Sequence, residues 1–288
     1  MQLVTFIADD RRRVGALLDD GVADLTAAGL PADMVELIES FDPAAVVDAT
    51  DRAPRRALGE VRISAPLRPP KNVMAVGRNY RAHAQEFSRS GFDASEKETL
   101  PSHPVIFTKA ATSVVGPEDP IVLSNDPTGT TDYEGELGVV IGRRCRRVTV
   151  EQARSVVFGW TIVNDVTARD LQKRHVQWFV GKSPDTFCPM GPAIVTVDEL
   201  PDIEDRFLET RVNGEVRQRA RIAELIFGID VLISTLSEVI TLEPGDVIAT
   251  GTPEGVGIGF DPPRYLQPGD VVEVSIEGIG TLRNPVTP

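Results

Sequence analysis

The chain has 288 residues, of which 41% are apolar and 25% charged, and its formal net charge is −13. This length suffices for one large domain, or for a large and a small one, with a substantial core. So acidic a body disfavours binding to nucleic acids or to anionic membranes, and no run of about 18 or more apolar residues predicts a transmembrane helix. The N-terminus turns charged at residues 9–13 and does not resemble a signal peptide, so we expect a cytoplasmic protein.

The first part of the chain is typical of a small α+β unit. Short apolar runs separated by turn residues predict two or three strands, and two helical patterns follow, with Pro43 in the first turn of the second. A proline-rich connector at residues 64–71 then suggests a boundary. We therefore predict a small N-terminal domain over residues 1–66 and a catalytic domain over residues 67–288.

Beyond the connector the pattern indicates strands and loops. Residues 73–77 predict a buried strand, and residues 104–109 predict another. Between them, residues 79–103 are polar and predict a long loop, which is typical of a lid or a mobile binding segment. Residues 150–175 predict a helix, a strand ending at Asp165 and a second, short helix.

Two carboxylates stand at the start of an apolar run in "DYEGELGVVIG", residues 132–142. Glu134 and Glu136 are two residues apart, so in a strand they point to the same face. Ion pairing at the entrance of a strand is the plain structural interpretation. A divalent cation is the functional one, since Mg²⁺, Mn²⁺ and Ca²⁺ favour oxygen ligands.

Asp165 follows the apolar strand "WTIV" and offers a third carboxylate, although an Asp at this position also suits a helix N-cap. Arg169 and Gln172 are three residues apart, so on a helix they share a face that suits an anionic ligand. Lys182, in "VGKSPD", is either a surface lysine or a buried cation that stabilises negative charge in a site.

The histidines suggest acid–base chemistry rather than zinc binding. His83, His103 and His175 form no zinc-binding pattern. His83 and Glu86 have helical spacing, so Glu86 could orient the imidazole while His83 acts as a base. A solvent-facing histidine is the alternative. Cys145 and Cys188 lack metal-binding spacing and are expected to be free thiols.

Considered together, these segments resemble the fumarylacetoacetate hydrolase family over about residues 70–288. The matching segments occur in the family's order: "VGRNYRAHAQE", "PVIFTKA", "DYEGELGVVIG", "GWTIVNDVTARDLQ", "GKSPDTFCPMGPAIVT", "VNGEVRQ", "LEPGDVIATGTPEGVG" and "LQPGDVVEVSIEGIG". The resemblance implies an α+β, β-rich fold, a mixed β-roll or sandwich preceded by the small N-terminal domain, and a homodimer.

The resemblance also implies the site. Glu134, Glu136 and Asp165 would hold one Mg²⁺ or Mn²⁺ ion per subunit, for which Ca²⁺ may substitute. His83 and Glu86 would activate water, and Lys182 would stabilise developing negative charge. The residues that hold the substrate would be Arg169, Gln172, Thr252 and Tyr80.

For function, the resemblance implies a small anionic 2-oxo acid as substrate. We predict a metal-dependent hydrolase that cleaves a C–C bond of an acylpyruvate, such as fumarylpyruvate or acetylpyruvate, through a pyruvate enolate. The alternatives are an oxaloacetate decarboxylase, an isomerase or decarboxylase of unsaturated 2-oxo dicarboxylic acids in aromatic catabolism, a sugar-acid or ureidoglycolate lyase, and a metal-binding member without turnover.

Overall fold

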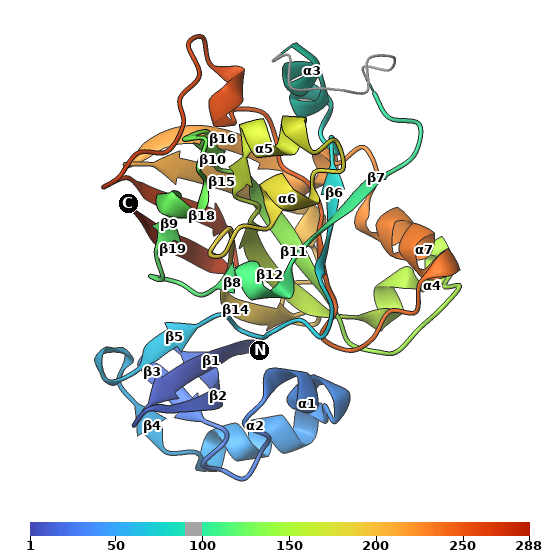
Figure 1. Ribbon diagram of the computed structural model, residues 1–288. Helices are drawn as coiled ribbons and strands as arrows, with labels where there is room; N and C mark the ends of the chain where they lie inside the picture. Colours follow the sequence, from blue (N-terminus) through green and yellow to red (C-terminus); the bar gives the residue numbers. More distant parts are fainter. Residues whose placement is uncertain (90–99) are drawn as a thin grey trace.

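A computed structural model describes residues 1–89 and 100–288 of the chain. Its largest element is a twelve-stranded mixed sheet, which crosses the molecule in Figure 1. Along this sheet the strands run in the order β4 (Arg55–Arg56), β3 (Gly21–Asp24), β2 (Arg11–Leu18), β1 (Gln2–Ala8), β14 (Cys188–Thr196), β12 (Val157–Asn164), β11 (Gly135–Ile141), β17 (Val247–Ala249), β6 (Val73–Gly77) and β7 (Val105–Lys109). Two further strands pair at its side, β5 (Arg62–Ser64) with β1 and β8 (Val114–Val115) with β14.

A second sheet packs against the centre of the first. Its strands run in the order β16 (Glu215–Arg221), β15 (Phe207–Val212), β18 (Val271–Ile276), β19 (Gly280–Thr287) and β9 (Ile121–Val122). Apolar side chains of both sheets, such as Trp160 on β12 and Val274 on β18, share one buried core. The predicted β-rich α+β fold with packed sheets is thus confirmed.

Seven helices lie around the sheets in the described part of the chain: α1 (Met34–Glu39), α2 (Pro43–Arg52), α3 (Arg81–Arg89), α4 (Val150–Ala153), α5 (Arg169–Arg174), α6 (Phe179–Lys182) and α7 (Ile229–Val239). The expected order of helix, strand and short helix is confirmed by α4, β12 and α5. Pro43 occupies the first turn of α2, and Asp42 caps that helix. None of the helices in the described residues is long and apolar enough to cross a membrane.

The N-terminal unit, drawn in blue in Figure 1, shares a sheet and a core with the rest of the chain. Leu3 of β1 pairs with Ile194 of β14 in antiparallel register. Leu25 and Leu37 are buried in the same apolar cluster as Met190 and Val247. The domain boundary between residues 66 and 67 stays a prediction, because β1 and β14 pair within one sheet across it.

The expectation of an irregular loop over residues 79–103 is wrong for its first part. Residues 81–89 form helix α3, because His83, Ala84 and Phe87 bury one face while exposed side chains occupy the other. The predicted lid extends over residues 90–99, which lie outside the described residues.

Candidate active site

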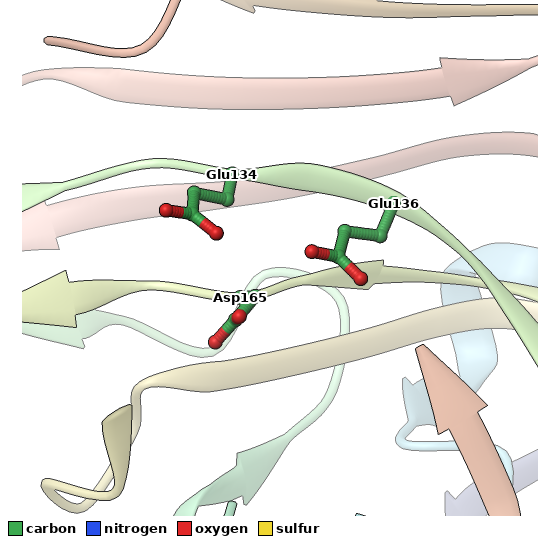
Figure 2. Close-up of side chains that lie close together, drawn as sticks. All are labelled: Glu134, Glu136 and Asp165. Atoms are coloured by element: carbon green, nitrogen blue, oxygen red, sulfur yellow. The ribbon is translucent and has the colours of Figure 1, made fainter. Parts of the chain in front are cut away.

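The predicted carboxylates come together where two neighbouring strands end. Glu134 and Glu136 flank the first residue of β11, and Asp165 directly follows β12. Antiparallel pairing of these strands, together with a 2.8 Å hydrogen bond from the Asp165 amide to the Glu134 carbonyl, fixes their alignment. All three side chains are buried, and one oxygen of each lies within 4.8 Å of the others. Figure 2 shows the side chains of Glu134 and Glu136, at the start of β11, both pointing toward Asp165.

Three buried cations surround this carboxylate triad. Lys182, on α6, lies 2.8 Å from Glu134 Oε2 and 2.6 Å from Asp165 Oδ2. Lys109, at the end of β7, lies 2.6 Å from Asp165 Oδ1. Arg169, at the start of α5, lies 2.6 Å from Glu134 Oε1. These ion pairs offset the cost of burying the charges of Glu134 and Asp165.

Glu136 lacks such a pairing. Its Oε2 accepts a 2.8 Å hydrogen bond from the Gly251 amide, but Oε1 is buried and has no hydrogen-bond partner in the described residues. Burial, with the charges of Asp165 and Glu134 in addition, raises the pKa of Glu136 well above its ordinary value. An unpartnered buried carboxylate oxygen beside two further carboxylates is a set of hard donors that fits a divalent cation.

Glu134 and Lys182 shift each other's pKa values. Burial alone would raise the pKa of Glu134, but the charges of Lys182 and Arg169 lower it to about 2. Burial alone would lower the pKa of Lys182, but Asp165 and Glu134 raise it above its ordinary value. Lys182 is therefore a persistent cation, better suited to stabilising negative charge than to moving a proton.

The His83–Glu86 pair lies on α3. The Nδ1 of His83 is 3.2 Å from Glu86 Oε2, and Glu86 Oε1 accepts a 3.0 Å hydrogen bond from the Gly255 amide. His83 is 4% exposed, which excludes the alternative of a solvent-facing histidine. Since Nδ1 is engaged by Glu86, Nε2 is the nitrogen left for proton transfer.

A small pocket joins this histidine to the triad. Its lining combines charged groups with an aromatic side: Val76, Gly77, Arg78, His83, Phe87, Phe107, Glu134, Glu136, Gln172, Trp178, Lys182 and Thr252. The Trp178 ring meets Phe87 and Phe107 edge-on, at centroid distances of 5.9 and 5.4 Å. Carboxylates, a lysine, a histidine and three aromatic rings thus line one cavity.

The predicted substrate-binding residues divide into two groups. Gln172 and Thr252 line the pocket. Arg169 is fully buried behind them, where its guanidinium contacts Asp132 at 2.8 Å and Gln172 at 3.2 Å, as its helical spacing from Gln172 predicted. Tyr80 is 2% exposed, does not line the pocket, and its hydroxyl has no hydrogen-bond partner in the described residues.

Three buried charged residues at the site were not predicted: Asp132, Lys109 and Arg78, of which Arg78 lines the pocket. Asp132 holds Arg169, and it continues the alternation of Glu134 and Glu136 two residues earlier, which is a signal that could have found it. Lys109 ends an apolar strand, "VIFTK", and a charge in that place is a weaker signal. Cys145 and Cys188 are free, as expected.

The architecture and this carboxylate cluster agree with a known family. The family model for the fumarylacetoacetate (FAA) hydrolase C-terminal domain matches residues 72–287. The chain therefore belongs to the fumarylacetoacetate hydrolase family of enzymes, which confirms the resemblance.

The similar proteins carry the names of different enzyme activities. The chain is 43% identical over 307 residues to oxaloacetate tautomerase YisK of Bacillus subtilis (strain 168), covering 99% of this chain and 100% of the relative. It is similar to the solved structure of a fumarylacetoacetate hydrolase from psychrophilic Exiguobacterium antarcticum, with a TM-score of 0.87, 46% identity, and coverage of 100% of this chain and 99% of that one. A maleylpyruvate hydrolase from Sphingobium sp. SYK-6, solved in complex with manganese(II) ion and pyruvate, gives a TM-score of 0.82 and 32% identity over 100% of this chain and 99% of that one.

Proposed function

We propose that this protein is a divalent-metal-dependent enzyme that interconverts the keto and enol forms of a small 2-oxo acid, with oxaloacetate as the first candidate. The observation that carries the proposal is one pocket that holds the unpartnered oxygen of Glu136, the cation of Lys182 and the oriented imidazole of His83. Identity of 43% to an oxaloacetate tautomerase over the full length of both chains supports this substrate.

Glu134, Glu136 and Asp165 would hold the metal ion, and Mg²⁺ or Mn²⁺ suits their oxygen donors. The relative solved with manganese(II) and pyruvate supports this assignment. When bound, such an ion supplies Lewis-acid polarisation of the 2-oxo group.

The chain's own residues would then move the proton and balance the charge. His83 Nε2 takes a proton from C3 of the 2-oxo acid and delivers it to the 2-oxo oxygen to give the enol, while Glu86 keeps the other ring nitrogen engaged. Lys182 stabilises the negative charge that develops on the 2-oxo oxygen, because its own proton is tightly held. Gln172 and Thr252 contact the substrate from the lining, and Arg169 keeps Glu134 and Gln172 in place.

Hydrolysis of an acylpyruvate is the second candidate, and the anchored His83–Glu86 pair favours it. A base whose orientation is fixed by Glu86 and Gly255 can also deprotonate a water molecule. That water would attack the second carbonyl, the C–C bond would break, and the electron pair would pass to a pyruvate enolate. The relative named maleylpyruvate hydrolase supports this alternative.

The deciding experiment compares oxaloacetate and acetylpyruvate with Mn²⁺ and with EDTA. Keto–enol conversion of oxaloacetate is followed by ultraviolet absorbance, and pyruvate release from both compounds by a coupled assay. Metal-dependent conversion of oxaloacetate without pyruvate release supports the tautomerase. Pyruvate from acetylpyruvate supports the hydrolase, pyruvate from oxaloacetate alone supports a decarboxylase, and no reaction with either compound contradicts the proposal.

A further inference from the structure

The three cations around the triad bind it from different sides. Lys182 takes one oxygen from each of two carboxylates, Glu134 Oε2 at 2.8 Å and Asp165 Oδ2 at 2.6 Å. The second oxygen of each carboxylate is bound elsewhere. Arg169 holds Glu134 Oε1 and Lys109 holds Asp165 Oδ1, each at 2.6 Å. Of these three cations, only Lys182 contacts both carboxylates, so a metal ion held by the triad would share Glu134 and Asp165 with its ammonium.

Lys109 is held firmly in its place. Its side chain is fully buried, and besides the ion pair with Asp165 its ammonium donates a 3.0 Å hydrogen bond to the Val166 carbonyl and another to the Lys182 carbonyl. Two of the three donors of this ammonium thus have backbone acceptors, in addition to the ion pair with Asp165. Lys109 thus ties Asp165 to the backbone on both sides of the triad.

Lys182 is placed differently. It lines the pocket, and its Nζ lies 4.9 Å from the centroid of the Phe107 ring. The acceptors of its ammonium in the described residues are the two carboxylates themselves. A flexible lysine with an aromatic face beside it can leave these oxygens and still keep its charge within the pocket.

We propose that Lys182 competes with the divalent ion for Glu134 and Asp165, whereas Lys109 is a positioning residue that holds Asp165 in place for either cation. Two cations that share the same oxygens repel each other, so removing the Lys182 charge should strengthen metal binding. Removing Lys109 should weaken it. The inference rests on the metal site of the proposed function and predicts opposite effects for two buried lysines.

The same competition implies that the metal ion binds before the substrate. When the ion displaces the Lys182 ammonium from Glu134 and Asp165, that ammonium lies in the pocket without a carboxylate partner from the triad. It is then the group that binds the carboxylate or the 2-oxo oxygen of an anionic substrate. Lys182 therefore pairs with the triad before the metal ion binds and with the substrate afterwards.

The test measures Mn²⁺ affinity by titration calorimetry on the full chain, without substrate. K182M should bind Mn²⁺ roughly fivefold more tightly than the wild type, and K109M roughly tenfold more weakly, which are typical couplings between groups in contact. K182R keeps the charge and should stay within about twofold of the wild type. K173M removes an exposed positive charge on α5, outside the triad, and controls for the change in net charge.

The melting temperature provides a second readout. In EDTA, K182M should melt lower than the wild type because Glu134 and Asp165 lose a shared partner, and Mn²⁺ should raise its melting temperature by more than it raises that of the wild type. K182Q serves the same comparison if K182M does not fold.

Mn²⁺ affinity of K182M equal to or weaker than that of K173M would overturn the competition. Unchanged or tighter binding by K109M would overturn the positioning role. If the wild type binds no Mn²⁺, both assignments fall together with the metal site. Turnover of oxaloacetate and acetylpyruvate is measured separately, so loss of this inference can be told apart from loss of the proposed function.

Discussion

His83 Nδ1 lies 3.2 Å from Glu86 Oε2, so the imidazole is oriented by a neighbour one turn along the same helix. That carboxylate is itself fixed, because the Gly255 amide donates to it and the Tyr133 hydroxyl donates at 2.9 Å to the Gly255 carbonyl. The base of the proposed reaction is thus connected to a loop far away in sequence.

We expect H83A to lower turnover by about 100-fold or more, since it removes the group that moves the proton. Mn²⁺ affinity, measured by calorimetry, should be unchanged, because His83 is not among the triad. H103A, which alters an exposed histidine, is the matched control. If H83A keeps its activity, the base is another residue.

E86Q should cost less than H83A, roughly tenfold in kcat, because the ring loses its orienting charge but keeps its nitrogen. The measurement is kcat and KM on the substrate that the first assay identifies. An effect confined to KM would show that Glu86 contacts the substrate instead of positioning the ring.

For the protein kept in EDTA, E136Q should increase the free energy of unfolding at neutral pH. The pKa of Glu136 is raised by burial and by its neighbours, so the folded state holds the proton more tightly than the unfolded chain. The cost of Glu136 is therefore absent well below its ordinary pKa of 4.5 and grows as the pH rises toward the folded-state value. Urea unfolding between pH 4 and 8 should show a difference in the free energy of unfolding between E136Q and the wild type that widens as the pH rises.

E134Q should change the free energy of unfolding in the opposite direction to E136Q. Lys182 and Arg169 lower the pKa of Glu134 to about 2, so its contribution is stabilising above its ordinary pKa of 4.5 and is lost as the pH falls toward 2. At pH 7, E134Q should destabilise the protein in the same urea experiment. A shift in the same direction for both variants would contradict the charge distribution described above. Each variant should also lose the rise in melting temperature that Mn²⁺ gives the wild type.

G181A should disturb the site through packing alone. A Cβ at Gly181 would lie 2.4 Å from the Gln172 amide nitrogen and 2.8 Å from the Ala168 carbonyl oxygen, so α5 and α6 must separate. We expect a loss of about 1–3 kcal/mol in stability and a lower kcat, because Lys182 and Gln172 move apart. At Gly59 an added Cβ meets nothing within 4 Å, so G59A should melt like the wild type. Equal melting temperatures for both variants would show that the helices adapt.

Alkylation by iodoacetamide at pH 8 should give one adduct, at Cys145. Burial raises the pKa of Cys188 to about 12, so its thiol stays protonated as well as inaccessible. The pKa of Cys145 is also raised by burial, but this side chain is only partly buried. Peptide mass spectrometry would locate the adduct, and a second one should require a denaturant. Rapid labelling of Cys188 in the folded protein would contradict its placement.

The shared face of Glu134 and Glu136 could be predicted from a local pattern, whereas their grouping with Asp165 was implied by the family resemblance. Two glutamates two residues apart in a strand must share a face, and the strand end at Asp165 was marked by the apolar run before it. The same alternation extends to Asp132, which passed unnoticed because an aspartate before a strand is also a common turn residue. The helix at residues 81–89 was missed for a similar reason, as its polar composition obscured the spacing of its buried residues.

The cations could not be assigned in the same way. Lys109 reaches Asp165 from another strand of the sheet, and no local pattern records which of many lysines a fold brings to a carboxylate. The roles of Arg169 and Tyr80 also depend on tertiary packing. Arg169 is not in the lining but contacts Asp132 and the pocket residue Glu134, and Tyr80 is buried outside the lining. The sequence therefore marked carboxylates and cations as candidates, but it did not indicate which cation contacts which carboxylate.

The pairing of β1 with β14 has a consequence for truncated forms of the protein. A fragment that begins at residue 67 would retain every residue of the triad and the pocket, yet the outer edge of β14 would lose its partner, and Met190 and Ile194 would lose part of their cover. An unpaired strand next to exposed apolar surface invites pairing with another chain. Pairing with β1 therefore protects the edge of β14 from aggregation. Proteolysis near the N-terminus should reduce solubility before it reduces catalytic activity.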